Sequence, residues 1–325
     1  MEKRTLGLSD MQFTRIGLGT AAIGGGGNRY GWGAQDDQDS IATILHGMNL
    51  GINWIDTAKL YGQGHSEEMV GKSIKGRRVE VYLATKCGVL WKEDGRDISY
   101  HLKAGSIKAE CESSLKRLQT DYIDLYQIHW PLPDEDIEVG WGAVADLIKE
   151  GKVRYGGVSN FSVEQMERIQ KIYPITSLQP PYSMLKRGIE KDILSFCAKN
   201  RIGVIVYSPM QEGLLTGKFT KGRVIALPED DMRKNNKFFQ EPQLSLIMDF
   251  VDKLRTIGTE IKQPVANIAL AWTLRRPEIT GAIAGARHPN QIEETYHTTD
   301  LKLAPGEWAK VDALLASFEK KFAEL

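Results

Sequence analysis

Apolar and polar positions repeat along the chain as a module, in which a short apolar run is followed by a longer stretch of helical periodicity. The segment Asp39 to Leu50 shows the helical part, because its apolar residues at positions 41, 44, 45 and 48 share one helix face. Ser106 to Leu118 and Val163 to Ile172 have the same periodicity, and Ser162 is placed to cap the latter. The apolar runs predicted as strands are Arg15 to Leu18, Ile52 to Asp56, Val81 to Thr85, Ile123 to His129, Val153 to Ser159, Thr176 to Gln179, Gly203 to Ser208 and Gly281 to Gly285.

Eight alternating strand and helix segments predict an α/β fold with a parallel sheet, and eight such units close naturally into a (β/α)8 TIM barrel. The alternative is an open, doubly wound sheet, which normally carries GxGxxG directly after its first strand. The early glycines read GLGTAAIGGGG from Gly17 to Gly27, and no convincing helical pattern follows directly. We therefore interpret this stretch as a flexible loop and favour the barrel.

Three further segments lie outside the repeating module. Thr5 to Arg15 is predicted to form an N-terminal hairpin that plugs the bottom of the barrel. Met210 to Gln243 is long, polar and weakly periodic, as expected of a functional or disordered loop. Pro289 to His297 and Pro305 to Phe322 are predicted as two extra C-terminal helices that close the fold. We expect one domain over residues 1–325, since α/β barrels run as single domains of roughly 250 residues or more.

Composition narrows the classes of function. Lys plus Arg and Asp plus Glu both number 42, so the chain lacks the basic excess of a nucleic-acid-binding protein. Apolar stretches such as Ile202 to Tyr207 are far shorter than the ~18 residues of a membrane span, and the start lacks a signal-peptide pattern. Cys87, Cys111 and Cys197 are odd in number and lack CxxC spacing. This pattern predicts no disulfide framework, no metal site and a reducing, cytoplasmic location.

Four reactive side chains stand at or just beyond the predicted strand ends. Asp56 ends the second run, Lys86 follows the third, His129 ends the fourth, and Tyr61 lies shortly after Asp56. Reactive residues of a barrel come from the C-terminal ends of several strands, so we expect all four at one mouth.

The chemistry of these four residues fits the reduction of a carbonyl group. Tyr61 can donate a proton to the oxygen, and a nearby Lys86 ammonium lowers the tyrosine pKa from its usual value of ~10. Asp56 can hold Lys86, while His129 can donate a hydrogen bond to the substrate oxygen. Taken singly, each residue also has a structural explanation, such as capping for Asp56 or packing for Tyr61. Their joint placement favours the catalytic interpretation.

At these residues the chain resembles the aldo-keto reductase family. IDTAKLYGQGHSEEMVG (Ile55 to Gly71) matches the family pattern DTAxxYGxGxSE at every fixed position. The resemblance covers nearly the whole chain. Its other matching segments are LATK (Leu83 to Lys86), YIDLYQIHWP (Tyr122 to Pro131), GKVRYGGVSNFS (Gly151 to Ser162), YSPM and GLLTGK (within Tyr207 to Lys218), and GAIAGARHPNQIEE (Gly281 to Glu294).

The resemblance implies a catalytic tetrad and an NADP(H) cofactor. The tetrad positions, with Tyr61 as general acid, are Asp56, Tyr61, Lys86 and His129. The positions implied to bind the nicotinamide are Ser159, Asn160 and Gln179 at its carboxamide and Tyr207 against its ring. Those implied to enclose the pyrophosphate are Ser208, Gly213, Leu214, Thr216 and Lys218. Those implied at the 2′-phosphate and adenine are Gly285, Arg287, Gln291 and Glu294.

Two positions depart from the family pattern near the adenosine site. Thr295 follows Glu294 where many relatives have asparagine, which puts one adenine hydrogen bond in doubt. His288 follows Arg287 where lysine is common. A neutral histidine lends a 2′-phosphate less charge than lysine, which weakens the expectation of a strict preference for NADP(H).

The expected function is reversible reduction of aldehydes or ketones by an NADP(H)-dependent oxidoreductase acting on a small carbonyl compound or polyol. YGWGAQDDQDS, VLWKEDG and HWPLP resemble the bacterial branch that includes polyol dehydrogenases and short-chain aldose reductases. Trp32, Trp91 and Trp130 are expected on loops at the mouth, where indole rings suit sugars and aromatic substrates alike, or serve as core packing.

Two other functions are compatible with the same barrel fold, and Cys87 also requires an interpretation. An NADP-binding regulatory subunit, similar to the potassium-channel β subunits, is the alternative, and the intact tetrad does not exclude it. An isomerase or aldolase is disfavoured, because Lys86 has partners in Asp56 and Tyr61 instead of an apolar pocket. Cys87, next to Lys86, is interpreted as a small barrel residue and not as an oxidation-sensitive thiol.

Overall fold

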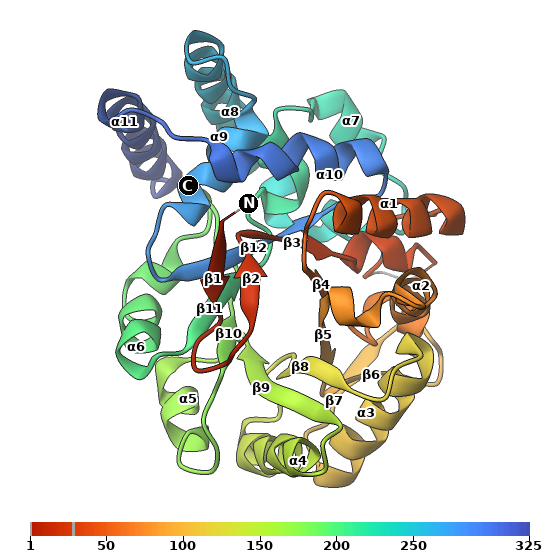
Figure 1. Cartoon of the computed structure of the whole chain (residues 1–325). Coiled ribbons are helices and arrows are strands. Elements are labelled where there is room, and N and C mark those ends of the chain that lie inside the picture. The colour runs from red at the N-terminus through yellow and green to blue at the C-terminus, as the bar shows by residue number, and fades with distance from the viewer. Residues whose placement is uncertain (1, 28–29) are drawn as a thin grey trace.

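Eight parallel strands close into a barrel at the centre of the protein (Figure 1), in a computed structural model that describes residues 2–27 and 30–325. Each barrel strand pairs with the next along the chain, and the last pairs with the first, where Gly285 lies opposite Gly19. The predicted (β/α)8 barrel is confirmed and the open sheet is excluded. The barrel strands are β3 (Ile16–Gly19), β4 (Trp54–Asp56), β5 (Tyr82–Cys87), β8 (Ile123–Ile128), β9 (Val153–Ser159), β10 (Ser177–Gln179), β11 (Gly203–Val206) and β12 (Ile279–Gly285).

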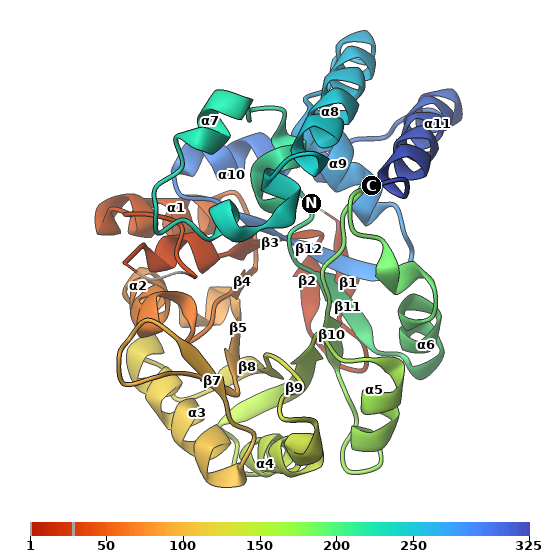
Figure 2. The same cartoon turned by 180° about the vertical axis from the view of Figure 1, so that it is seen from behind.

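Helices form a ring around the barrel (Figures 1 and 2). The ring closes where α10 packs against α1. The predicted cap is confirmed, since the Ser162 hydroxyl accepts from the backbone N–H of Gln165 within a full capping box. The ring helices are α1 (Asp37–Asn49), α2 (His65–Ile74), α3 (Ala104–Leu118), α4 (Ile137–Lys149), α5 (Val163–Ile169), α6 (Ile193–Asn200), α9 (Val265–Leu274) and α10 (Pro289–Tyr296).

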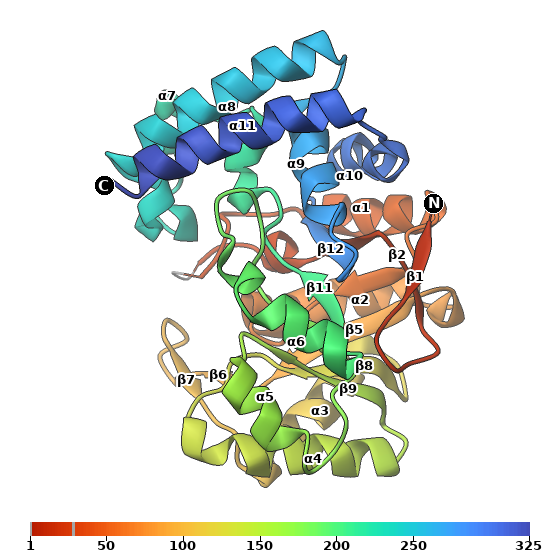
Figure 3. The ribbon, with the colours of Figure 1, turned by 90° about the vertical axis from the view of Figure 1, so that its left-hand side faces the viewer.

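Two long helices, α8 (Gln243–Glu260) and α11 (Pro305–Phe322), lie side by side outside this ring (Figure 3). The rings of Phe250 and Phe318 meet between them, with centroids 4.7 Å apart. The two helices predicted after the last barrel strand are confirmed as α10 and α11. The helix α10 belongs to the ring, and the partner of α11 is α8, which precedes the last barrel strand.

An N-terminal hairpin covers one end of the barrel, as predicted. Its antiparallel strands are β1 (Lys3–Thr5) and β2 (Gln12–Thr14). Leu6, Met11 and Phe13 are fully buried, and the Phe13 ring stacks on Trp54 with centroids 4.7 Å apart. Apolar side chains therefore fill this end of the barrel interior and exclude water from it.

The segment from Met210 to Gln243, predicted as a functional or disordered loop, instead contains short helices. The apolar side chains of Leu215, Phe219, Leu227 and Phe239 are buried, and they hold the segment onto the body of the protein. Its elements are η6 (Gln211–Thr216), α7 (Lys221–Ile225), η7 (Met232–Asn235) and η8 (Lys237–Phe239), where η denotes a 3-10 helix.

The glycine-rich stretch is also more ordered than predicted, because Gly17 and Gly19 belong to β3 and η1 (Ala21–Gly24) follows. A second hairpin, of β6 (Val89–Trp91) and β7 (Ile98–Tyr100), leaves the barrel after β5. The remaining 3-10 helices are η2 (Tyr61–Gly64), η3 (Arg78–Glu80), η4 (Asp134–Asp136), η5 (Gly188–Glu190) and η9 (His297–Asp300).

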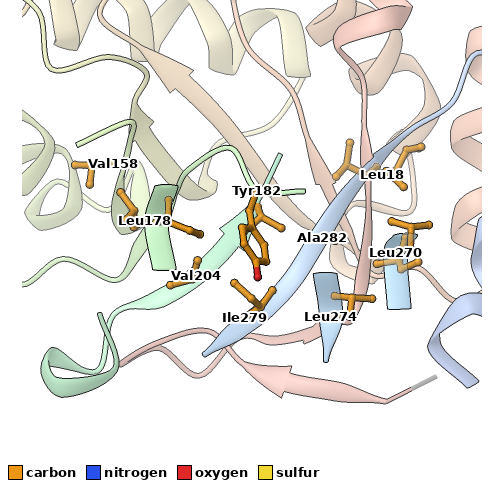
Figure 4. Close-up of a cluster of buried hydrophobic side chains, with 14 of the residues drawn as sticks. Leu18, Val158, Leu178, Tyr182, Val204, Leu270, Leu274, Ile279 and Ala282 are labelled. Carbon is orange, nitrogen blue, oxygen red and sulfur yellow. The ribbon is translucent and has the colours of Figure 1, made fainter. Parts of the chain in front are cut away.

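The core lies between the barrel and its helices. All ten residues of α9 are buried, because this helix is covered on one side by the barrel and on the other by α8 and α10. No helix among the described residues is both long and apolar enough to cross a membrane. Figure 4 shows part of the core, with Leu18, Val158, Leu178, Tyr182, Val204, Leu270, Leu274, Ile279 and Ala282 labelled.

Candidate active site

The four residues predicted to be catalytic meet at the end of the barrel opposite the hairpin. Asp56 is the last residue of β4, Lys86 the second-last of β5, and His129 directly follows β8. Tyr61 begins η2, on the turn that leaves β4. Because the strands are parallel, their C-terminal ends share one mouth, and sequence positions 56 to 129 become neighbours.

Lys86 is at the centre of this cluster. Its Nζ lies 2.6 Å from Asp56 Oδ2 and donates to the Thr57 carbonyl at 3.0 Å and to the Tyr61 hydroxyl at 3.1 Å. Asp56 and Lys86 are only 2% and 1% exposed, so each depends on the other for its charge. All three donor hydrogens of the ammonium therefore have acceptors, which fixes its position.

Two glycines allow the turn that carries Tyr61. Gly62 has φ +59°, and a Cβ built there would lie 2.0 Å from the carbonyl oxygen of Gly24. A Cβ on Gly24 would in turn meet the backbone of Tyr61 at 2.7 Å. The turn therefore presses against η1, and this close approach aims the phenol at Lys86.

A buried ion pair that the sequence analysis did not identify supports β5 from behind. Glu67 of α2 is fully buried and accepts from Arg117 of α3, with Nη2 2.6 Å away. Its other oxygen accepts from the Thr85 hydroxyl at 2.6 Å. Thr85 directly precedes Lys86, so two helices fix the strand at the point where the lysine leaves it.

The pKa of Tyr61 is raised, which corrects the expectation of a lowered value. Burial of the hydroxyl is the largest cause; Lys86 lowers the pKa as expected, and Asp56 raises it again. Burial works against the charge of Lys86, but Asp56 and Tyr61 together raise the pKa of the ammonium. Near neutral pH the site therefore holds a protonated phenol beside a charged lysine.

His129 lies on the other side of the tyrosine, with ring centroids 6.0 Å apart in an edge-on arrangement. Burial and the nearby Lys86 hold the pKa of His129 well below its usual range. A neutral imidazole keeps one N–H, which it can donate to a substrate oxygen.

The residues predicted to bind a nicotinamide are joined by hydrogen bonds beside the tetrad. Asn160 Nδ2 donates to the His129 carbonyl at 3.1 Å and to Ser159 Oγ at 3.0 Å. The Tyr207 hydroxyl donates to Asn160 Oδ1 at 2.9 Å. Asn160 has φ +64°, a strained conformation for a non-glycine residue that places its amide at the mouth.

Gln179 makes a contact that the sequence did not predict. Its Nε2 donates to Asp56 Oδ1 at 2.8 Å, and Gln127, another residue that sequence reasoning missed, lies 3.5 Å from the same oxygen. Gln127 and Gln179 point into the barrel from β8 and β10. They provide Asp56 with neutral donors in addition to Lys86.

The segment predicted to enclose a pyrophosphate has an unusual backbone. Ser208 has φ +51° and Gly213 has φ +100°. Leu214 is 2% exposed, so its side chain belongs to the core and only its backbone can serve a ligand. The Thr216 hydroxyl donates to the Gly213 carbonyl at 2.6 Å, and Lys218 forms an ion pair with Glu294 on α10. The structure thus joins a residue predicted at the pyrophosphate to one predicted at the adenine.

The residues predicted at the 2′-phosphate lie where β12 passes into α10. Gly285 ends β12, and Gln291 Oε1 accepts from the backbone N–H of Arg287 at 2.7 Å. The Arg287 guanidinium donates to neutral oxygens of residues 32–35. His288 lies 3.1 Å from Asp39, and Thr295 donates to the Ile292 carbonyl within α10 at 3.0 Å.

The three tryptophans predicted at the mouth are partly exposed, whereas Cys87 is buried. Trp91 on β6 donates to the Leu60 carbonyl at 3.2 Å, next to Tyr61, and its ring meets Tyr30 edge-on. Trp32 and Trp130 are half-buried, so none of the three is a core residue. Cys87 is 1% exposed, and burial raises the pKa of its thiol well above the usual value, in agreement with the packing interpretation.

Comparisons with known proteins agree with this architecture. A model of the Aldo/keto reductase family matches residues 15–316. The chain is 39% identical to the aldo-keto reductase YhdN of Bacillus subtilis, over 97% of this chain and 94% of that protein. It is 33% identical to the NADH-specific methylglyoxal reductase of Escherichia coli, over 98% and 100%. The glycerol dehydrogenase AKR11B4 of Gluconobacter oxydans superposes with a TM-score of 0.86 at 36% identity, over 97% and 95%.

Proposed function

The chain belongs to the aldo/keto reductase family, and from that premise we propose that it is an NADP(H)-dependent oxidoreductase that reversibly reduces aldehydes or ketones, with Tyr61 as general acid. The observation that carries the proposal is the position of Lys86, which contacts Asp56 Oδ2 at 2.6 Å and the Tyr61 hydroxyl at 3.1 Å. We take residues 1–325 as one catalytic domain, because the barrel and its site draw on nearly the whole chain.

Each residue of the tetrad has one task in this proposal. A bound nicotinamide supplies the hydride. Tyr61, protonated at neutral pH because burial raises its pKa, donates a proton to the oxygen that becomes negative. Lys86 stabilises the phenolate left behind, and Asp56 keeps Lys86 charged and in place. His129 donates its N–H to the same oxygen and orients the carbonyl.

The donor chemistry fits a nicotinamide dinucleotide phosphate. Ser159, Asn160 and Gln179 gather hydroxyl and amide groups beside the tetrad, as a carboxamide requires. The Arg287 guanidinium donates to neutral oxygens, so it can exchange them for a phosphate without breaking an ion pair. On that basis we favour NADP(H), although the Escherichia coli relative is named NADH-specific.

The proposed substrate class is a small carbonyl compound or polyol. The relatives named for methylglyoxal and glycerol support it, and so does the indole of Trp91 next to Tyr61. The three buried, free cysteines agree with a reducing, cytoplasmic location.

A cofactor-oxidation screen tests the proposal. The purified protein is assayed with NADPH and with NADH against methylglyoxal, glyceraldehyde, aldoses and aromatic aldehydes. We expect turnover of at least one short-chain aldehyde and a higher kcat/KM with NADPH. Tight binding of NADPH without turnover across the panel would contradict the proposal and favour a regulatory subunit.

A further inference from the structure

The guanidinium of Arg287 is held by a segment that lies more than 250 residues earlier in the chain. Its Nε donates to Gln35 Oε1 at 2.6 Å and its Nη1 to the Trp32 carbonyl at 3.0 Å. Its Nη2 donates to the carbonyl of Ala34. All three nitrogens of the guanidinium therefore already have acceptors on residues 32–35.

The Gln35 side chain makes two hydrogen bonds to Arg287. While Oε1 accepts from the guanidinium, Nε2 donates to the Arg287 backbone carbonyl at 3.0 Å. Gln35 and Arg287 are both half-buried, which limits the access of water to these bonds. Burial and the nearby charge of Arg233 lower the pKa of Arg287. An anion would therefore stabilise this guanidinium. Its Nε has no second hydrogen to offer such an anion, because the single hydrogen is donated to Gln35.

Residues 32–35 are anchored on the other side as well. The Trp32 N–H donates to the Gly25 carbonyl at 3.1 Å, and the Met232 N–H donates to the Gly31 carbonyl at 3.0 Å. The guanidinium of Arg233 lies 4.9 Å from the centre of the Trp32 ring. The segment that carries the two backbone acceptors of Arg287 is thus held by Gly25, which follows η1, and by η7, which follows α7. The flexible acceptor is the side chain of Gln35.

A 2′-phosphate binds arginine best through two parallel hydrogen bonds from neighbouring nitrogens. To gain the pair that includes Nε of Arg287, the phosphate must displace Gln35 Oε1, because Nε carries a single hydrogen and Gln35 already accepts it. NAD(H) has no such phosphate and leaves the contacts intact. The affinity gained from the phosphate is consequently reduced by the free energy of the hydrogen bond between Arg287 and Gln35 that the phosphate replaces.

We propose that Gln35 is a specificity-determining residue that competes with the 2′-phosphate for Arg287 and so narrows the preference for NADP(H) over NAD(H). This inference rests on the proposed role of Arg287 in binding the 2′-phosphate. Arg287 follows β12 and Gln35 follows β3, the two strands whose pairing closes the barrel. The inference adds Gln35 to the residues that set the ratio of NADP(H) affinity to NAD(H) affinity.

Three variants test the competition. Gln35→Ala frees Nε, and Gln35→Glu places a carboxylate on the same nitrogen. Gln38→Ala, an exposed glutamine in the first turn of α1, is the matched control. Dissociation constants for NADPH and NADH are measured with the whole chain by quenching of tryptophan fluorescence.

We expect Gln35→Ala to tighten NADPH binding about 10-fold or more, because the competing hydrogen bond that is lost comes from a charged guanidinium. We expect Gln35→Glu to weaken NADPH binding about 10-fold or more, because a carboxylate repels the phosphate and holds the guanidinium. NADH binding stays unchanged in both variants, and the control changes neither cofactor. Equal shifts for NADPH and NADH would overturn the inference and make Gln35 a purely structural residue.

A further variant, Arg287→Ala, distinguishes a failure of this inference from a failure of the proposed function. If that variant loses the NADPH preference while the Gln35 variants leave it unchanged, the competition is wrong and the cofactor assignment stands. If it weakens NADPH and NADH equally, the 2′-phosphate assignment fails, and the role of Gln35 fails with it.

Discussion

Burying a lysine is costly unless its charge is matched, and at Lys86 the match is nearly complete. The ammonium is 1% exposed and has Asp56, the Thr57 carbonyl and the Tyr61 hydroxyl as acceptors. Asp56 is in turn supported by the amide of Gln179. Burial alone would favour neutral side chains at this site. The charges of Lys86 and Asp56 therefore take part in setting the pKa of Tyr61.

Replacing Lys86 by methionine should shift the pH profile of alcohol oxidation. In the proposed mechanism that direction requires deprotonated Tyr61. Lys86 is the group that lowers the pKa of Tyr61, whereas burial and Asp56 raise it. We expect Lys86→Met to lower the rate and to move the rising limb of log kcat/KM to higher pH. Lys103→Met, at a side chain 73% exposed, should leave the profile in place. A slower variant with an unchanged limb would contradict the coupling.

At the scale of residues, the sequence could predict those site residues that lie at or next to the ends of barrel strands. Asp56, Lys86 and His129 were identifiable because parallel strands bring their C-terminal ends together whatever their separation in sequence. Gln35 and Arg287 were not linked, because their contact depends on the path of a loop after β3. The net direction of the Tyr61 pKa was also missed, because burial depends on the packing around the phenol and leaves no local pattern in the sequence.

At the scale of elements, α3 carries a buried acid that has no part in the proposed mechanism. Glu110 is 2% exposed, and its carboxylate accepts from the Gly88 N–H and the Ser106 hydroxyl, each at 3.1 Å. Gly88 directly follows β5, so α3 holds the strand just beyond Lys86. Burial raises the pKa of Glu110 to about 7.

The raised pKa of Glu110 predicts a pH-dependent stability. Unfolded chains lose this proton near the ordinary value of 4.5, whereas the folded protein keeps it up to about 7. The folded state therefore binds more protons in that window, and the free energy of unfolding falls as pH rises through it. Glu110→Gln should remove this fall, which is on the order of 3 kcal/mol at about 1.4 kcal/mol per pKa unit.

Urea unfolding at pH 5 and pH 8 measures the effect. The exposed Glu167 on α5 supplies the control variant Glu167→Gln, which should keep the wild-type dependence on pH. If Glu110→Gln lost as much stability as the wild type between these pH values, Glu110 would be ionised in the folded protein throughout.

Periodicity identified some elements and missed others for a clear reason. Helices α1 and α3 have one buried face, so their apolar residues recur at helical spacing. Helix α9 is buried on all sides and shows no such face. The segment between β11 and α8 was predicted as a loop because its helices are too short to show a period.

At the scale of the whole molecule, the barrel interior is divided into a dry half and a polar half. Phe13 and Trp54 stack at the hairpin end, whereas Asp56 and Lys86 lie toward the mouth. Trp54 and Asp56 belong to the same short strand, so one element contributes to both halves. The alternation of barrel strands and helices was visible in the sequence, but the pairing of α8 with α11 was not, because it joins segments on either side of β12.

This division predicts that the hairpin stabilises the fold without shaping the site. Phe13→Ala removes a fully buried ring and should lower the free energy of unfolding by about 3–5 kcal/mol. Leu8→Ala, at a side chain 46% exposed in the hairpin turn, should change it by less than about 0.5 kcal/mol. Urea unfolding gives both values, and NADPH affinity at 25 °C should be unchanged in both variants. A large loss of affinity in Phe13→Ala would show that the two halves are coupled.

The central claim is that Tyr61 donates the proton in carbonyl reduction, and Tyr61→Phe tests it most directly. The ring and its contact with His129 remain, and only the hydroxyl is lost. Steady-state kcat for the best aldehyde of the screen is compared among wild type, Tyr61→Phe and Tyr155→Phe, a tyrosine whose hydroxyl contacts Asp10 at the hairpin end. We predict a fall in kcat on the order of 10²-fold or more for Tyr61→Phe, with unchanged NADPH affinity and a wild-type rate for Tyr155→Phe. A kcat close to wild type in Tyr61→Phe would contradict the account.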